Sequence, residues 1–216
     1  RYTGGLRYHM IHTFNRLGNP DTLSLDPMVT YDLEVQTIPP VRLDSVRLLA
    51  GRHNTISINA PQGFRYVKTR RGSSYDRDQF LVKRAGEQEI INIQETGTVG
   101  KYLVGTYDLL IPIYPKMVVK GVKISQSKTT TVEIPAPGYV TFNTGQRGAG
   151  SLYQLDPSGN QIWVMNLLEN TKTQAYYLQP GSYQLVFRRN DHRSSSYTTI
   201  RNFSVKEGSP QSISLY

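Results

Sequence analysis

Tyr107-Asp108-Leu109 is the middle copy of a pattern from which the fold of this chain can be worked out. The first copy begins at Tyr31 and reads Tyr-Asp-Leu, and the third begins at Tyr183 and reads Tyr-Gln-Leu. The two steps are equal, since 107 − 31 = 76 and 183 − 107 = 76. A fixed period of this size predicts an array of similar units, so the fold has to be worked out for each unit.

Apolar residues alternate at period two in every copy. The first run comprises Tyr31, Leu33 and Val35; Tyr107, Leu109 and Ile111; Tyr183, Leu185 and Phe187. Two later runs comprise Val46/Leu48, Val122/Ile124 and Phe203/Val205, and then Ile56/Ile58, Val132/Ile134 and Ile213/Leu215. Strict alternation is typical of a strand with one face in a core. We therefore expect at least three strands in each unit.

The unit boundaries are predicted at two Ala-Pro steps. The chain ends just after Ile213, Ser214 and Leu215, so the last alternating run closes a unit. In the earlier copies that run is followed by Ala-Pro and then by a new strand. The predicted units are 1–61, 62–137 and 138–216. The first is short and is expected to lack its opening strand, as a fragment of a longer protein would.

A complete unit is predicted to contain seven short strands. In the third unit they are expected at 138–143, 151–155, 161–166, 174–178, 182–188, 197–205 and 211–216. Short strands separated by Gly, Pro and Asn turns predict an all-β tandem array of small antiparallel β-sandwich domains. The glycine-rich stretch 145–150 is expected to be a flexible hairpin connection. The short Ala-Pro linkers between units predict a rod with limited bending.

The prolines near the ends of the repeated tyrosine strands have two interpretations. They are Pro39, Pro40, Pro112 and Pro115. Proline does not donate to a ladder, so these residues are expected to protect sheet edges. The alternative is a proline-rich docking segment.

The net charge of +9 suggests an interaction surface. Basic residues gather with aromatic ones in 65–78 and again in 188–197. The candidate interaction patch is Arg70, Arg71, Tyr75, Arg77, Arg188, Arg189 and Arg193. Such residues bind phosphate or anionic polysaccharide. The alternative is two solvated hairpin loops.

No catalytic, metal-binding or cofactor-binding motif is found in the sequence. The chain has no cysteine, which excludes disulfides and thiolate chemistry. His9 and His12 are three residues apart in a predicted strand, which places them on opposite faces. The nucleotide-binding and hydrolase motifs, such as a phosphate loop or HExxH, are absent. We expect no cofactor, no metal and no enzymatic activity.

Aromatic residues could contact a ligand, but their pattern favours the core. The three repeated tyrosines share one strand parity, so each ring is expected to be buried with its hydroxyl satisfied at the rim. Tyr176 and Tyr177 are adjacent, so one of them should point outward. Trp163 is expected to be half-buried. Asp32 and Asp108 recur but are replaced by Gln184, which indicates an outward strand position rather than a ligand-binding residue.

The stretches 180–187 and 203–208 resemble transthyretin-like and PEGA-like sandwich domains. Residues 121–131, with 37–41 and 51–54, look like the tandem C-terminal repeats of von Willebrand factor A-domain-containing proteins of Bacteroidota. The resemblance covers about residues 20–216. It implies a fragment of a cell-envelope protein, in the periplasm or on the cell surface, whose metal-dependent adhesion domain lies elsewhere. This chain has no Asp-x-Ser-x-Ser string, so no ligand site is carried over.

Three functional hypotheses follow. The leading one is a non-catalytic stalk or docking array for protein partners. The second is a carbohydrate- or peptidoglycan-binding module that uses tyrosines and the two basic loops. The third is nucleic-acid binding through charge alone. No run of about 18 apolar residues is present, so no membrane-spanning segment is predicted.

Overall fold

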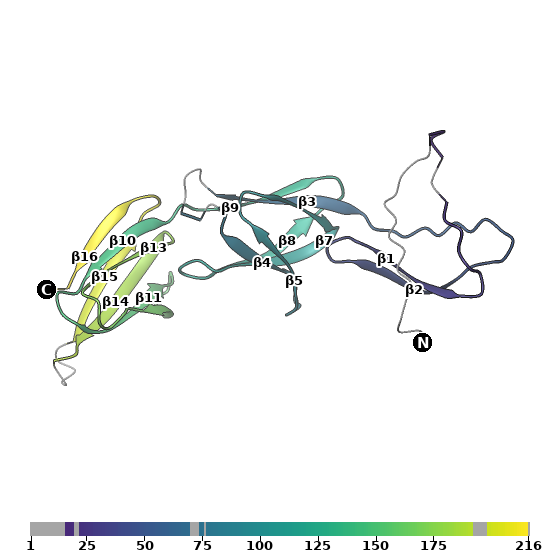
Figure 1. The fold of residues 1–216 in the computed structure, drawn as a ribbon. Coiled ribbons are helices and arrows are strands. Elements are labelled where there is room, and N and C mark those ends of the chain that lie inside the picture. The colour runs from purple at the N-terminus through teal and green to yellow at the C-terminus, as the bar shows by residue number, and fades with distance from the viewer. Residues whose placement is uncertain (1–15, 20–21, 70–73, 76, 192–197, 216) are drawn as a thin grey trace. The chain divides into compact units, whose positions relative to one another are not determined.

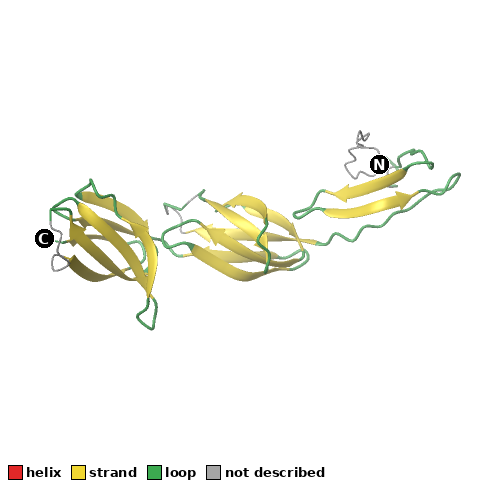
Figure 2. Ribbon diagram, turned by 90° about the horizontal axis from the view of Figure 1, so that it is seen from below, coloured by secondary structure: helices red, strands yellow, loops and turns green. Residues whose placement is uncertain are grey.

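Alternating apolar residues become strands throughout the structure. The computed structural model describes residues 16–19, 22–69, 74–75, 77–191 and 198–215. Within these residues the chain forms sixteen strands and no helix (Figure 1; Figure 2). The predicted all-β fold class is confirmed. The strands are Thr30–Val35 (β1), Val41–Arg47 (β2), Gln62–Thr69 (β3), Gln79–Arg84 (β4), Ile90–Glu95 (β5), Val99–Leu103 (β6), Gly105–Ile111 (β7), Met117–Ile124 (β8), Thr129–Ile134 (β9), Gly138–Asn143 (β10), Gly148–Leu155 (β11), Gln161–Asn166 (β12), Thr173–Leu178 (β13), Gly181–Arg189 (β14), Thr198–Val205 (β15) and Pro210–Ser214 (β16).

Strands β3 to β9 form one small sandwich. Its sheets have the orders β6-β3-β9 and β5-β4-β7-β8. The inward residues of both sheets make one buried core, which includes Val67, Phe80, Leu109 and Ile124. Each of these side chains is fully shielded from solvent. The alternation in the sequence therefore directs every second residue into this core.

Strands β10 to β16 repeat that arrangement with sheet orders β13-β10-β16 and β12-β11-β14-β15. Seven strands were predicted for this unit, and the observed bounds differ from the predicted ones by a few residues at most. One pairing differs from the expected antiparallel pattern. The closing strand pairs parallel with the opening strand in both sandwiches, β9 with β3 and β16 with β10. A closing strand therefore depends on an opening strand for its hydrogen bonds.

That dependence explains the first unit. Its described residues contain only the β1–β2 hairpin. The predicted closing strand around Ile56 and Ile58 is not a strand here, because no opening strand pairs with it among the described residues. The equivalent of Ile58 is Ile134, which is 2% exposed inside a complete sandwich.

Contacts divide the chain into two parts at the hairpin itself. One part holds Arg42–Ile58 and the described residues up to Glu34, and the other holds Val35–Val41 with Asn59–Tyr216. The tip of the β1–β2 hairpin therefore belongs with the sandwich that follows it. Both sandwiches lie in the second part.

The glycine-rich stretch 145–150 is not simply a flexible connection, because β11 begins at Gly148. A Cβ atom on Gly148 would lie 2.3 Å from the carbonyl oxygen of Arg188. One on Gly150 would lie 2.9 Å from a methyl of Leu167. These glycines permit close packing of β11 against its neighbours.

The recurring aspartates stabilise a bulge. Asp32 Oδ1 accepts a hydrogen bond of 2.9 Å from the N–H of Ser45, and Asp108 Oδ1 accepts one of 2.9 Å from Gly121. Ser45 and Gly121 are also one period apart in the sequence, and both have positive φ. The β7–β8 register shifts near Asp108, as in a β-bulge. In β14 the position is Gln184, and the β14–β15 ladder is regular.

We predict that Asp108→Ala destabilises the β3–β9 sandwich by about 1 kcal/mol, because the N–H of Gly121 loses its acceptor. Gln184→Ala is the matched control and should change stability by less than about 0.5 kcal/mol. Urea unfolding measures both, and amide hydrogen exchange at Gly121 should accelerate only in Asp108→Ala. Unchanged exchange at Gly121 would contradict the role given to Asp108.

Candidate functional site

The tips of the β1–β2 and β7–β8 hairpins have the same backbone conformation. In the first, the N–H of Thr37 donates to the carbonyl of Val35 over 2.8 Å. In the second, the N–H of Ile113 donates to the carbonyl of Ile111 over 2.9 Å. A cis peptide bond follows each turn, at Ile38-Pro39 and Tyr114-Pro115. The period of the sequence therefore extends to the two hairpin tips.

Each tip contacts the sandwich that follows it in the chain. The carbonyl of Ile38 accepts a hydrogen bond of 2.8 Å from the N–H of Leu103. The carbonyl of Tyr114 accepts one of 2.7 Å from the N–H of Gln179. Leu103 and Gln179 are again one period apart, at the end of β6 and just after β13. We call these two contacts the joints.

The repeated tyrosines fix the other side of each joint. Tyr107 donates its hydroxyl to the carbonyl of Leu103 over 2.8 Å, and Tyr183 donates to the carbonyl of Gln179 over 2.6 Å. Their rings are 2% and 0% exposed. The prediction of buried rings with satisfied hydroxyls is confirmed for both. The backbone of one residue, Leu103 or Gln179, thus binds the preceding hairpin through its N–H and a core tyrosine of its own sandwich through its carbonyl.

Side chains pack around the second joint. Ile113 is 5% exposed and belongs to the core of the β3–β9 sandwich. The ring of Tyr114 meets the ring of Tyr176 edge-on, with centroids 6.5 Å apart. Gln179 Nε2 donates to the carbonyl of Pro135 over 3.5 Å. These contacts combine ring packing with polar contacts.

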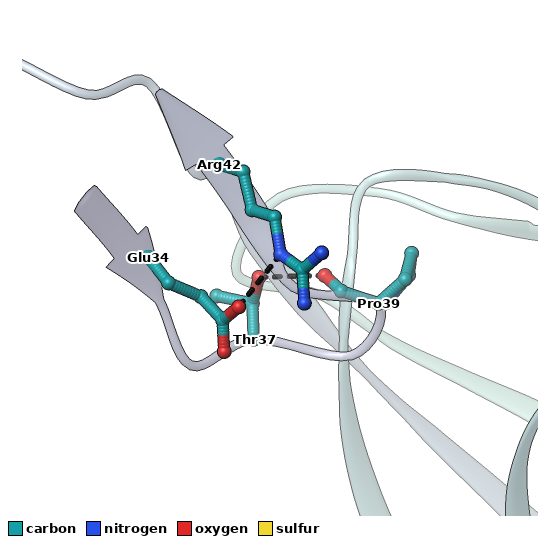
Figure 3. Close-up of polar contacts among 4 residues, drawn as sticks. All are labelled: Glu34, Thr37, Pro39 and Arg42. Atoms are coloured by element: carbon teal, nitrogen blue, oxygen red, sulfur yellow. Dashed lines mark hydrogen bonds and ion pairs between the residues drawn. The ribbon is translucent and has the colours of Figure 1, made fainter. Parts of the chain in front are cut away.

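The prolines lie in the hairpin tips. Pro39 is buried, and Ile38 packs on the core of the β3–β9 sandwich. Figure 3 shows this tip, where Thr37 Oγ1 donates to the carbonyl of Pro39 over 2.7 Å. Pro39 therefore lies in a hairpin tip that docks within the chain, rather than on an exposed sheet edge.

An ion pair flanks the first tip (Figure 3). Arg42 Nε lies 2.7 Å from Glu34 Oε2, and both side chains are largely exposed. An exposed pair of this kind stabilises a protein by about 0–1 kcal/mol. The equivalent residues of the β7–β8 hairpin are Leu110 and Val118, which face each other across the ladder. The tip geometry is therefore compatible with either pair.

The first hairpin has proline where the sandwiches have the joint residue. Pro27 lies one period before Leu103 and has no backbone N–H. Tyr31 donates its hydroxyl to the carbonyl of Asp26 over 3.0 Å instead. Residue 27 therefore lacks the donor that makes a joint of this type.

The structure does not show the predicted patch as one exposed surface. Arg70, Arg71 and Arg193 lie outside the described residues, as do His9, His12 and His192. Arg77 and Arg188 are exposed, while Arg189 is paired with Asp191 by two hydrogen bonds of 2.5 and 3.0 Å. Tyr75 is only 5% exposed. Burial raises its pKa, and the Gln179 side chain partly offsets that rise. Its ring is thus packed near the second joint and does not lie at the surface.

Arg65, from the predicted basic stretch, is fully buried in the β3–β9 core. Its Nη2 donates one hydrogen bond to Gln94 Oε1 and one to the hydroxyl of Tyr102, each 2.5 Å long. Its Nε and Nη1 make no hydrogen bond. The guanidinium lies 4.8 Å from the ring centroid of Phe80. Burial lowers the pKa of Arg65 from its ordinary value to about 10.

Two described aromatic residues depart from the sequence expectations: Tyr31 was expected to be buried but is only partly buried, and the other is Trp163. Tyr177 is 46% exposed and points outward beside the partly buried Tyr176, as predicted. Trp163 was expected to be half-buried but is 60% exposed. Its position after Gln161 and Ile162 on an edge strand leaves the ring uncovered.

The part of the chain that is described holds no cluster of three or more metal-ligating side chains. None of the described segments forms an apolar helix of the length that a bilayer crossing needs.

Comparisons with known proteins provide little. No protein-family model matches the chain, and no curated protein matches it. One solved structure that matches is described as "The Bacillus anthracis TIE protein", at 12% identity and a TM-score of 0.28. The match covers 72% of this chain and 34% of that one, so the chain spans about a third of that structure's length. A similarity this low carries no argument. The resemblance to the repeats of von Willebrand factor A-domain proteins stays a prediction.

We predict that Arg65→Met raises the free energy of unfolding by about 1 kcal/mol. The substitution removes a buried charge that has no carboxylate partner, and Gln94 keeps the hydroxyl of Tyr102 as a donor. Val140 occupies the equivalent position of the other sandwich. The control is Lys68→Met on the same strand. Lys68 is exposed, so its replacement should change the free energy of unfolding by less than about 0.5 kcal/mol. Destabilisation by Arg65→Met in urea unfolding would show that its ring and amide contacts outweigh the charge.

We also predict that stability falls as the pH rises above about 10. Burial raises the pKa of Tyr183 above the ordinary value of 10.0, and that of Tyr107 is raised for the same reason. The folded state thus keeps protons that the unfolded state loses, and this contribution disappears as the pH climbs towards the folded pKa. Tyr183→Phe should lower the free energy of unfolding by about 1 kcal/mol near neutral pH. In this variant the free energy of unfolding should also fall less steeply above about pH 10. An unchanged slope in urea unfolding between about pH 8 and pH 11 would contradict this.

Proposed function

We propose that the chain is a non-catalytic array of β-sandwiches that acts as a stalk or protein-docking module in a bacterial cell-envelope protein. The observation that carries the proposal is the repeated joint. A spacer needs successive domains to keep a defined relation, and here the same contact recurs with the same period as the fold. The envelope setting rests on the resemblance to the tandem repeats of envelope proteins.

The joint is suited to restrain motion because it does not rely on a linker alone. The backbone bond between Tyr114 and Gln179 anchors the hairpin tip to the next sandwich. The linker after β9 adds a second point, where the N–H of Ala136 donates to Glu207 Oε1 over 3.2 Å. Two separate attachments restrict rotation more than either does alone. Ala136 and Pro137 are themselves buried, which supports a packed connection.

The backbone chemistry also makes the joint independent of side-chain identity. The donor is the peptide of Leu in one joint and of Gln in the other. The acceptor is the carbonyl of Ile38 or Tyr114. Any residue except proline supplies such a donor, so an array can vary its side chains while retaining its joints.

We predict that the distance between the two sandwiches is narrowly distributed in solution. The chain has no cysteine, so two spin labels can be placed at the exposed equivalent positions Thr106→Cys and Ser182→Cys. Pulsed electron-spin measurements should give a narrow distance distribution. Gln179→Pro removes the N–H and should broaden that distribution.

Gln179→Ala is the matched control, because it keeps the N–H and loses only the side-chain contacts. It should broaden the distances less than Gln179→Pro. A broad distribution in the unmodified array would contradict the stalk proposal. Circular dichroism of each variant shows whether both sandwiches are still folded.

A further inference from the structure

The outer face of the β12-β11-β14-β15 sheet differs from the rest of this basic protein. Side chains alternate across the sheet, so Leu152 and Leu185 enter the core while their neighbours point outward. From the row of Ser151 to the row of Leu155, none of the outward side chains is charged. The first charged residue on this face, Arg188, lies at the end of β14. The whole chain carries +9, so this neutrality is a local feature.

The fold does not impose that neutrality. The equivalent β5-β4-β7-β8 sheet points Lys83, Asp108, Glu95 and Lys123 outward. Between them lies an aliphatic row across its four strands, made of Ile93, Leu81, Leu110 and Val118. Two sheets of one topology thus have different outer chemistry. The difference lies in the choice of side chains.

Two aromatic side chains lie on the neutral face, Trp163 exposed and Tyr153 partly buried. Trp163 on β12 is directly opposite Tyr153 on β11, a separation of about 5 Å between Cβ atoms. The indole N–H of Trp163 donates to Asn166 Oδ1 over 3.1 Å, and Ser151 donates to the same oxygen over 2.9 Å. The indole is therefore held by a hydrogen bond although 60% of the side chain is exposed.

Amide side chains continue from the aromatic pair across the sheet. Gln161 Nε2 donates to Gln184 Oε1 over 2.5 Å, and Gln184 Nε2 donates to Asn202 Oδ1 over 2.9 Å. Gln184 is also the direct neighbour of Tyr153. A primary amide has two N–H donors and two lone pairs, so each of these groups can make further bonds. The face presents ordered neutral donors and acceptors beside two aromatic rings.

We propose that this face binds a neutral polysaccharide. A sugar ring has an apolar C–H face that packs on an aromatic ring and a rim of hydroxyls that both donate and accept. Amides match such hydroxyls without any charge, and a few oriented polar groups beside apolar ones are typical of ligand sites. A protein partner fits this face less well. About a quarter of the residues of a typical protein are charged, and the neutral face has no charged side chain to pair with them.

This proposal moves the glycan site away from the basic loops and changes the ligand class from anionic to neutral. It goes beyond the stalk role and does not depend on it, since the face belongs to one sandwich. The other sheet of the same sandwich provides a control. Tyr139 and Tyr177 are 43% and 46% exposed on its outer face. Their rings are 5.1 Å apart and tilted by 53°, so each ring covers part of the other.

The test is retention by defined polysaccharides. The full chain is incubated with insoluble cellulose and chitin, and is run in affinity gels that contain mixed-linkage β-glucan, mannan or anionic polygalacturonate. We expect retention by at least one neutral polymer, unaffected by a rise in salt from about 0.05 to 0.5 M because no ion pair is involved. Trp163→Ala should weaken binding roughly tenfold or more, as truncation of an aromatic anchor does. Tyr153→Ala should weaken it too.

The control is the double variant Tyr139→Ala/Tyr177→Ala, which should bind within about twofold of the unmodified chain. Failure of all four neutral polymers to retain the chain overturns the proposal. So does binding lost in the control variant but kept in Trp163→Ala, or salt-sensitive binding to polygalacturonate alone. Thermal unfolding of Trp163→Ala checks that weaker binding does not come from unfolding. Because the Trp163 side chain is exposed, we expect this variant to remain folded.

Discussion

The backbone N–H and carbonyl groups of Leu103 and Gln179 hold the two joints together. Each has one polar group bound by the preceding hairpin tip and the other bound by a tyrosine of its own core. A buried peptide group that loses its partner costs about 1–3 kcal/mol. The hairpin tip and the buried tyrosine are therefore coupled through the backbone of a single residue, which connects domain packing to the fold of each domain.

The period preserves this backbone geometry while the side chains diverge. Arg65 and Val140 occupy the same inward position of the two opening strands, one as a buried cation and the other as an ordinary core residue. The outer faces of the four-stranded sheets diverge in the same way. Repeated topology therefore leaves room for a function that belongs to one unit, such as the neutral face around Trp163.

The β1–β2 hairpin shows which strand interactions are obligatory. An antiparallel hairpin forms from neighbouring residues, so β1 and β2 are present although the described residues of the first unit hold no further strand. A closing strand has its partner far away in the sequence, and residues 55–58 remain without a ladder. The same alternating pattern thus forms a strand in β9 and no strand at residues 55–58. The difference is that β9 has an opening strand, β3, to pair with.

The all-β class, the seven strands of a complete unit and the burial of Tyr107 and Tyr183 could be predicted from the order of amino acids, because alternation and period are local properties. The parallel pairing and the joints could not, since partners such as Ile38 and Leu103 are far apart in the chain. Arg65 was misread because its basic neighbours suggested a solvated loop, although it shares the strand parity of the buried Val67. The exposure of Trp163 follows from the place of β12 at a sheet edge. Pairing order and edge position are properties of the assembled sheets, so they become visible only when the strands are seen together in space.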